Sequence, residues 1–206
     1  MNKFPLISLA AAALLALASF DAPAQAQWTG VAQRKGAPVT LDELQQAHWI
    51  ADGRDDAPRK VYVFLDANCV YCAKFWADAR PWVDSGKVQL RYVMVAVIAP
   101  TSAGKAATLL ADPDPAKRLT AYERAHAFGV ARMLQGGPRH SMEDANLAPT
   151  LPIPEAVGRT LAANEGLMNA LALRGTPGLV FQGPDGRLVA LGGMPANGLE
   201  SIFGPR

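Results

Sequence analysis

The chain has two cysteines, Cys69 and Cys72, and they lie three positions apart in the stretch DANCVYCAKFW. Because this stretch follows an apolar segment and opens a helical pattern, Cys69 is expected at the start of a helix. Unpaired N–H groups and the positive end of the helix dipole lie there, and both stabilise a thiolate. The spacing places Cys72 about one helical turn further on, within reach of the first sulfur. The pattern therefore favours a redox pair in which Cys72 resolves a mixed disulfide formed on Cys69.

Two other interpretations of this spacing stay open. A zinc site is usually closed by a tetrahedral set of Cys and His side chains, but the three histidines, His48, His126 and His140, are distant from the cysteines in sequence. We predict no metal site and no cofactor, and we assign no functional role to a histidine. A structural disulfide is the stronger alternative, although so short a ring constrains the unfolded chain little.

Two side chains near the cysteines have candidate roles. Asp66 precedes Cys69 by three positions. Its carboxylate can hydrogen-bond the turn at the end of the strand, or it can modulate the thiol pair. Trp76 follows Cys72 by four positions, on the same helical face, and is expected in the core.

The elements that must position the cysteines form a strand–helix–strand unit. Residues 60–67 and 87–98 are rich in β-branched and aromatic residues and are nearly all apolar, which predicts two buried strands. A helix is predicted between them over 70–83, and Pro81 should kink or end it. Such a unit forms a right-handed parallel crossover.

Helical and turn signals flank this unit. Thr40 and Glu43 form a capping box that predicts a helix through about Ala51. An Ala-rich pattern from about residue 105 and a second helix from Pro154 predict a helical insertion over about 105–174, with an irregular loop at 135–154. A hairpin over 178–193 and a closing helix over 195–203 follow. The predicted class is α/β, a thioredoxin-like fold with a helical insertion, preceded by a linker helix.

The first 26 residues have the layout of a secretory signal. A basic start at Lys3, an apolar run over about 6–20 and the small-residue pattern before Gln27 predict cleavage after Ala26. The run is shorter than a membrane-spanning helix requires, although an uncleaved anchor is an alternative. Export places the cysteines where disulfides persist. The formal net charge of +2 argues against nucleic acid, which requires clustered Lys and Arg.

From about residue 41 to the end, the sequence resembles the DsbC/DsbG thiol:disulfide interchange proteins of the bacterial periplasm, and it is closest to the DsbG branch. The resemblance is carried by the stretch from VYVFLDANCVYC to KVQLRYVMVAVI, and by DPAKRLTAYE, NEGLMNALALRGTPGLVF and LESIFG. With residues 1–26 assigned to the signal by their own pattern, the resemblance implies a leader and linker helix over 27–58 and a thioredoxin-like catalytic domain over 59–206.

The resemblance also implies roles for individual residues. Cys69 corresponds to the attacking cysteine and Cys72 to the resolving one. Thr176 and Pro177 match the Thr–cis-Pro loop of the family, which presents backbone groups to an extended substrate. Of the spacer residues, Tyr71 matches the family, whereas Val70 replaces the Pro or Gly of its relatives, and spacer residues affect the thiolate pKa.

The implied activity is that of a periplasmic thiol–disulfide oxidoreductase. It would act on exported proteins as a reductase or isomerase, or rescue their oxidised cysteines, and a membrane reductant of the DsbD type would reduce it. Family members carry an N-terminal dimerisation domain, but about thirteen residues separate the signal from Thr40. We therefore expect that this domain is lacking and that the chain is a monomer. The alternatives are a dithiol oxidase of the same fold, and a chaperone-like binding module with an incidental disulfide.

Overall fold

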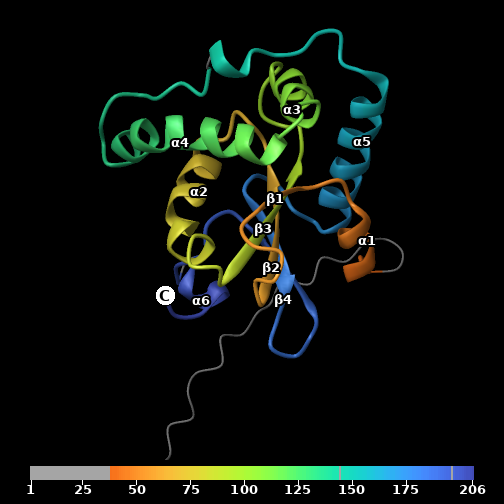
Figure 1. The fold of residues 1–206 in the computed structure, drawn as a ribbon, viewed down its shortest axis with the longest axis vertical. Coiled ribbons are helices and arrows are strands. Elements are labelled where there is room, and N and C mark those ends of the chain that lie inside the picture. Colours follow the sequence, from red (N-terminus) through yellow and green to blue (C-terminus); the bar gives the residue numbers. More distant parts are fainter. Residues whose placement is uncertain (1–37, 144, 196) are drawn as a thin grey trace, which may run out of the picture.

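A five-stranded mixed sheet in the order β1-β3-β2-β4-β5 forms the centre of the computed structural model, which describes residues 38–206 except 144 and 196 (Figure 1). Strands β2 and β3 are parallel, and the other neighbours are antiparallel. The predicted signal and most of the predicted leader lie outside the described residues. The strands are β1 Ile50–Asp52, β2 Arg59–Leu65, β3 Val88–Met94, β4 Gly178–Gln182 and β5 Leu188–Gly192.

The predicted strand–helix–strand unit is present as β2, helix α2 (Val70–Val83) and β3. The helix does not end at Pro81 and continues for two residues, to Val83. Proline removes one backbone donor, but Pro81 lies in the last turn of α2, so the loss is confined to the end of the helix. The Ser85 hydroxyl then donates to the Pro81 carbonyl (2.8 Å), which satisfies one of the terminal acceptors.

Alternating residues of β2 face two separate cores. Val61, Val63 and Leu65 pack in the core that contains the buried faces of α2 and α4 (Pro115–Leu134), together with α6 (Glu200–Phe203). Tyr62 and Phe64 pack instead with residues of α1 (Leu41–Gln46) and α5 (Glu155–Ala170). The sheet is therefore covered by helices on both faces, with α2, α4 and α6 on one side and α1 and α5 on the other (Figure 1).

The helical insertion is present between β3 and β4. It consists of α3 (Ser102–Leu110), α4, a 3-10 turn over Ala145–Leu147 and α5. Helix α4 begins at Pro115, after Asp114 accepts a hydrogen bond from the Lys117 N–H (3.0 Å), as an N-cap residue should. Two helices are shorter than predicted. Helix α5 ends at Ala170, and α6, which follows the hairpin, begins only at Glu200. None of the helices in the described ranges is long and apolar enough to cross a membrane.

The prediction of a helix through Ala51 is wrong. The capping box is present, because the Thr40 N–H donates to Glu43 (2.8 Å) and the Glu43 N–H donates to the Thr40 hydroxyl (3.3 Å), but α1 ends at Gln46. Ile50–Asp52 then pairs antiparallel with β3. The carboxylate of Asp52 also accepts two hydrogen bonds from the guanidinium of Arg80 on α2. These long-range contacts hold the segment as an edge strand. A pattern confined to neighbouring residues in the sequence cannot predict them.

Candidate redox site

Cys69 is the N-cap residue of α2, directly after the carboxyl end of β2. Its Sγ accepts a hydrogen bond from the Cys72 N–H (3.2 Å), and its own N–H donates to the Asp66 carbonyl (3.0 Å). A side chain at this position meets the unpaired donors and the positive end of the helix dipole. The predicted placement of the sulfur at a helix start is confirmed.

The two cysteines differ in their access to solvent. Both are free thiols. Cys69 is 3% exposed and Cys72 is fully buried. Cys69 is therefore the one that another protein can reach, and Cys72 can react only with the sulfur of Cys69 itself.

The two thiols also differ in pKa, in opposite directions. A hydrogen bond from Cys72 lowers the pKa of Cys69, and the Thr176 side chain and the Cys72 N–H add to the effect against the opposing influence of burial. Burial raises the pKa of Cys72 well above its usual value, and hydrogen bonding and repulsion by the Cys69 thiolate raise it further. When the pair loses one proton, the negative charge therefore resides on Cys69.

The loop before β4 lies against the first sulfur. The Cys69 thiol donates to the Thr176 carbonyl (3.2 Å), and the Thr176–Pro177 peptide bond is cis, as the family resemblance implied. The two residues between the cysteines differ in exposure. Val70 is half-buried against the core, and Tyr71 is 53% exposed. The roles assigned to these four residues stay predictions.

Asp66 anchors the backbone around the site. Its carboxylate is buried and accepts hydrogen bonds from the N–H groups of Asn68 (2.8 Å), Val97 (2.7 Å) and Ile98 (2.9 Å), and from the Ser102 hydroxyl (2.8 Å). These bonds also explain why β3 ends at Met94, earlier than predicted, since the chain turns there to reach Asp66. The interpretation of Asp66 as a structural residue is supported, and its charge has only a minor effect in raising the pKa of Cys69.

Sequence reasoning missed a buried lysine behind the cysteine loop. Lys105 of α3 is fully buried, and its Nζ donates to Asn68 Oδ1 (2.7 Å) and to the Met142 carbonyl (2.8 Å). The Asn68 amide in turn donates to the hydroxyls of Thr101 (3.1 Å) and Ser102 (2.9 Å). Lys105 therefore fixes the residue that precedes Cys69. A lone lysine in an Ala-rich helical pattern gave no signal of this contact.

Trp76 lies in the core as predicted. Two of the histidines lie together, since His126 Nδ1 is 2.8 Å from His140 Nε2, at a sequence separation of 14 residues. His48 is exposed. Within the described ranges, no group of three or more His, Cys, Asp or Glu side chains is placed to hold a metal ion.

Apolar surface lies beside the loop that contacts the Cys69 sulfur. Val97 and Ile98 are 49% and 50% exposed, and they line a cavity of about 470 Å³ that extends to Leu173 and Thr176. Thr176 therefore contacts the sulfur through its carbonyl and also forms part of this cavity.

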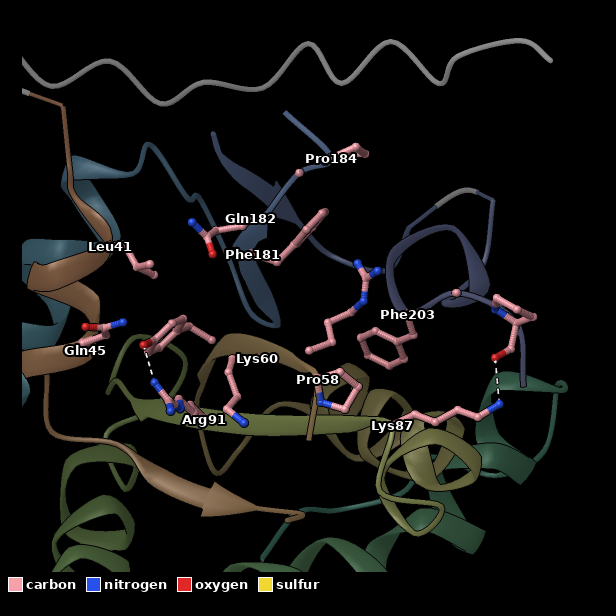
Figure 2. Close-up of a pocket in the computed structure, with 15 residues that line it drawn as sticks. Leu41, Gln45, Pro58, Lys60, Lys87, Arg91, Phe181, Gln182, Pro184 and Phe203 are labelled. Atoms are coloured by element: carbon pink, nitrogen blue, oxygen red, sulfur yellow. Dashed lines mark hydrogen bonds between the residues drawn. The ribbon is translucent and has the colours of Figure 1, made fainter. Parts of the chain in front are cut away.

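A larger cavity of about 770 Å³ lies at the other end of the sheet, by the amino end of β2, and does not include the cysteines. Figure 2 shows Lys60, Lys87 and Arg91 on one side of it and Phe181 and Gln182 on the other. Lys60 and Lys87 donate to backbone carbonyls, and Arg91 donates to a glutamine and a tyrosine side chain. The size of a cavity is thus a poor guide to the chemistry of this protein.

Residues 50–204 match the family model of the thioredoxin-like domain. The thiol:disulfide interchange protein DsbG of Pseudomonas aeruginosa is 44% identical over 165 residues, which are 80% of this chain and 58% of that protein. DsbG of Escherichia coli is 40% identical over 152 residues, which are 74% of this chain and 55% of that protein. The chain thus spans little more than half the length of these relatives.

Solved structures agree on the fold. The catalytic domain of Proteus mirabilis ScsC has a TM-score of 0.57 at 22% identity, with 79% of this chain and 91% of that chain covered. A periplasmic thioredoxin-like protein from Salmonella enterica serovar Typhimurium has a TM-score of 0.58 at 16% identity, with 81% and 97% covered. The predicted thioredoxin-like α/β fold is confirmed.

Proposed function

The chain belongs to the thioredoxin-like domain family, and from this membership and its similarity to DsbG we propose that it is a thiol:disulfide interchange protein acting through Cys69 and Cys72. The asymmetry of the two thiols carries the proposal. Cys69 has the lowered pKa and the exposed edge, whereas Cys72 is buried beneath it with a raised pKa. A structural disulfide would require neither difference.

The reaction begins when the Cys69 thiolate attacks a substrate disulfide. A Cys69–substrate S–S bond forms, and the other substrate sulfur leaves as a thiolate. Cys72 then loses its proton and attacks Cys69 Sγ, which closes the Cys69–Cys72 disulfide and releases the second substrate thiolate. An electron pair passes to the substrate, and an external dithiol must reduce the pair again. The same attack on a sulfenic acid would release water and rescue an oxidised cysteine.

The substrate side of the site suits an extended polypeptide. The Thr176–Pro177 loop presents backbone groups beside the sulfur, where a passing strand can pair. Next to it, Val97, Ile98 and Leu173 line a cavity that can take an apolar side chain. We therefore assign disulfides or oxidised cysteines in exported proteins, flanked by apolar residues, as the substrate class. The periplasm is the proposed compartment, with a membrane reductant of the DsbD type as electron donor.

Trapping of the mixed disulfide tests the function. Cys72→Ala removes the resolving thiol, so covalent adducts with periplasmic proteins should accumulate on Cys69 and disappear under a reducing agent. The double variant Cys69→Ala/Cys72→Ala is the matched control and should give none. If the folded Cys72→Ala protein forms no adduct, the proposal is wrong.

The direction of exchange is a separate question. A lowered pKa of Cys69 stabilises the dithiol form, and this makes the disulfide more oxidising. That observation favours the dithiol oxidase as the second candidate. Equilibration of the pair with glutathione gives its reduction potential, and a potential well below that of glutathione would exclude the oxidase.

A further inference from the structure

The cavity of about 770 Å³ at the amino end of β2 is lined, among the described residues, by four basic side chains and by no carboxyl group. Arg59 and Lys60 belong to β2, Lys87 directly precedes β3, and Arg91 belongs to β3. The volume lies within the range of about 300–1,000 Å³ that is usual for small-ligand sites. The cavity does not include the cysteines, so the redox reaction does not explain why these charges gather here.

The four charges are not neutralised by carboxylates. In the part of the chain that the structure describes, none of the four cations forms an ion pair. Two aspartates lie next to lining residues, but Asp55 accepts from Gln89 Nε2 (2.7 Å) and Asp185 accepts from the Arg187 N–H (3.1 Å). A cleft with charges of one sign concentrates ions of the opposite sign. The cavity therefore favours a negatively charged ligand.

Arg91 is held in place by uncharged partners. Its Nε donates to Gln89 Oε1 (3.0 Å) and its Nη1 to the Tyr62 hydroxyl (2.6 Å), and its guanidinium carbon lies 4.4 Å from the centre of the Trp49 ring. A guanidinium has five N–H donors. These two bonds use two of them, and Nη2 donates to none of the described residues. A guanidinium that is fixed in this way, with donors still available, is preorganised to bind an oxyanion.

Lys60 is oriented in a similar way and lies near Arg91. Its Nζ donates to two backbone carbonyls (2.5 and 2.6 Å), which leaves one of its three N–H groups for a ligand. Lys60 pairs with Gln89 across the parallel strands, and Gln89 precedes Arg91 by two residues. The side chains of Lys60 and Arg91 therefore lie on the same face of the sheet. Both residues are half-buried, whereas Arg59 and Lys87 are exposed at the edge of the cavity.

Apolar side chains form much of the remaining lining. They are a leucine, two phenylalanines and three prolines, namely Leu41, Phe181, Phe203, Pro58, Pro184 and Pro205. Figure 2 shows Phe181 and Pro184 across the cavity from Lys60 and Arg91. A proline side chain loses almost no conformational entropy when a ligand packs on it. The lining therefore suits a ligand that has an apolar part as well as an acidic one.

We propose that this cavity binds a small organic anion, with the acidic group of the ligand between Lys60 and Arg91. The apolar body of the ligand packs on Leu41 and the prolines. A carboxylate, sulfonate or phosphate monoester supplies the acceptor oxygens, and an aromatic or aliphatic group supplies the apolar contact. The site lies at the opposite end of β2 from Cys69, so the anion and a polypeptide substrate can be bound at the same time.

Two naphthalene probes test the charge requirement without any substitution. At neutral pH 2-naphthoate carries a negative charge, whereas 2-naphthol has the same rings and no charge. Calorimetric titration of the full chain should show one site for 2-naphthoate, with an affinity at least about tenfold higher than for 2-naphthol, the value of one charge-assisted hydrogen bond. Added salt should weaken the binding of 2-naphthoate, because it screens exposed charges. Inorganic phosphate, which has charge but no apolar body, should compete more weakly than 2-naphthoate.

Substitutions locate the site. Arg91→Gln and Lys60→Gln should each weaken the binding of 2-naphthoate by about 10- to 100-fold. The matched controls are Arg132→Gln and Lys117→Gln, which remove exposed charges of α4 and should bind as wild type does. Ile98→Ser alters the other cavity, beside the Thr176 loop, and should also leave the affinity unchanged. Circular dichroism verifies that each variant is folded.

Several results would overturn the proposal. They are equal affinities for 2-naphthoate and 2-naphthol, unchanged binding in folded Arg91→Gln and Lys60→Gln, or binding lost in Ile98→Ser instead. Phosphate that competes as strongly as 2-naphthoate would refute the apolar part of the site. If Arg91→Gln does not fold, the comparison of the two probes with wild type and the Lys60→Gln variant decides. The redox function does not affect these results, because neither cysteine lines the cavity.

Discussion

The carbonyl oxygen of Thr176 lies 3.2 Å from the Sγ of Cys69, at a sequence separation of 107 residues. As a thiol, Cys69 donates to this carbonyl, and on ionisation that bond is lost. The buried hydroxyl of Thr176 has no hydrogen-bond partner among the described residues, and the Thr176 side chain lowers the pKa of Cys69. One residue therefore offers an acceptor to the thiol and a donor to the thiolate.

Thr176→Val should raise the pKa of Cys69, because it removes the hydroxyl and leaves the backbone carbonyl in place. At neutral pH a smaller fraction of Cys69 is then thiolate, so alkylation by iodoacetamide should slow by about two- to tenfold, the value of one hydrogen bond. The thiolate fraction can be followed by its ultraviolet absorbance against pH.

The matched control is Thr176→Ser, which keeps the hydroxyl and should behave as wild type. If the valine and serine variants titrate alike, the hydroxyl has no part in lowering the pKa of Cys69.

The reduced protein should gain stability from Cys69 as pH rises. The pKa of Cys69 is lower in the folded state than its value of about 8.5 in an unfolded chain, so between the two values the unfolded state binds more protons. The contribution is complete above about pH 8.5 and is lost as pH falls through the folded pKa. Urea unfolding of wild type and Cys69→Ser across this range measures it, and the difference in unfolding free energy should grow with pH. A constant difference would show that the pKa of Cys69 is not lowered.

Glu123 should have the opposite effect on stability. Its pKa is raised by folding, so its contribution is complete below about pH 4.3, the unfolded value, and is lost as pH rises through the folded pKa. The unfolding free energy of wild type should therefore fall relative to that of Glu123→Gln across this window. The exposed Glu155→Gln is a charge-matched control and should show no such divergence. Parallel curves for wild type and Glu123→Gln would mean that the carboxyl group is not held protonated by the fold.

Local patterns predicted the parts of the fold that local forces determine. The boundaries of α2 follow from a helical pattern that opens at Cys69, and the hairpin of β4 and β5 follows from two apolar runs around a Gly-Pro-Asp-Gly turn. The segment Ile50–Asp52 was misassigned because its strand conformation depends on pairing with Tyr92 and its neighbours in β3, and on Arg80 of α2. No window of sequence contains those partners.

The residues of the site also divide into those that local sequence indicates and those that only the tertiary packing brings to it. Cys69 and Cys72 are apparent from their spacing, whereas Thr176 was found only through the family resemblance, because nothing in its own segment indicates that it meets a sulfur. Glu123 and Lys105 were missed because charged residues in helical patterns are normally solvated. Their burial arises when α4 and α3 pack over the cysteine loop, which is a tertiary event.

Asp66 tests whether a carboxylate beside the thiols is structural or electrostatic. Asp66→Ala leaves three backbone N–H groups and the Ser102 hydroxyl without their acceptor, so the unfolding free energy should fall by about 3 kcal/mol or more. Asp66→Asn keeps one acceptor oxygen and should cost less. Removal of the charge should also lower the pKa of Cys69 slightly, since repulsion from Asp66 is the smallest of the effects that shift this pKa. Urea unfolding and thiolate absorbance of both variants measure the two effects. A large change in the pKa of Cys69 with little loss of stability would show that Asp66 acts mainly through its charge.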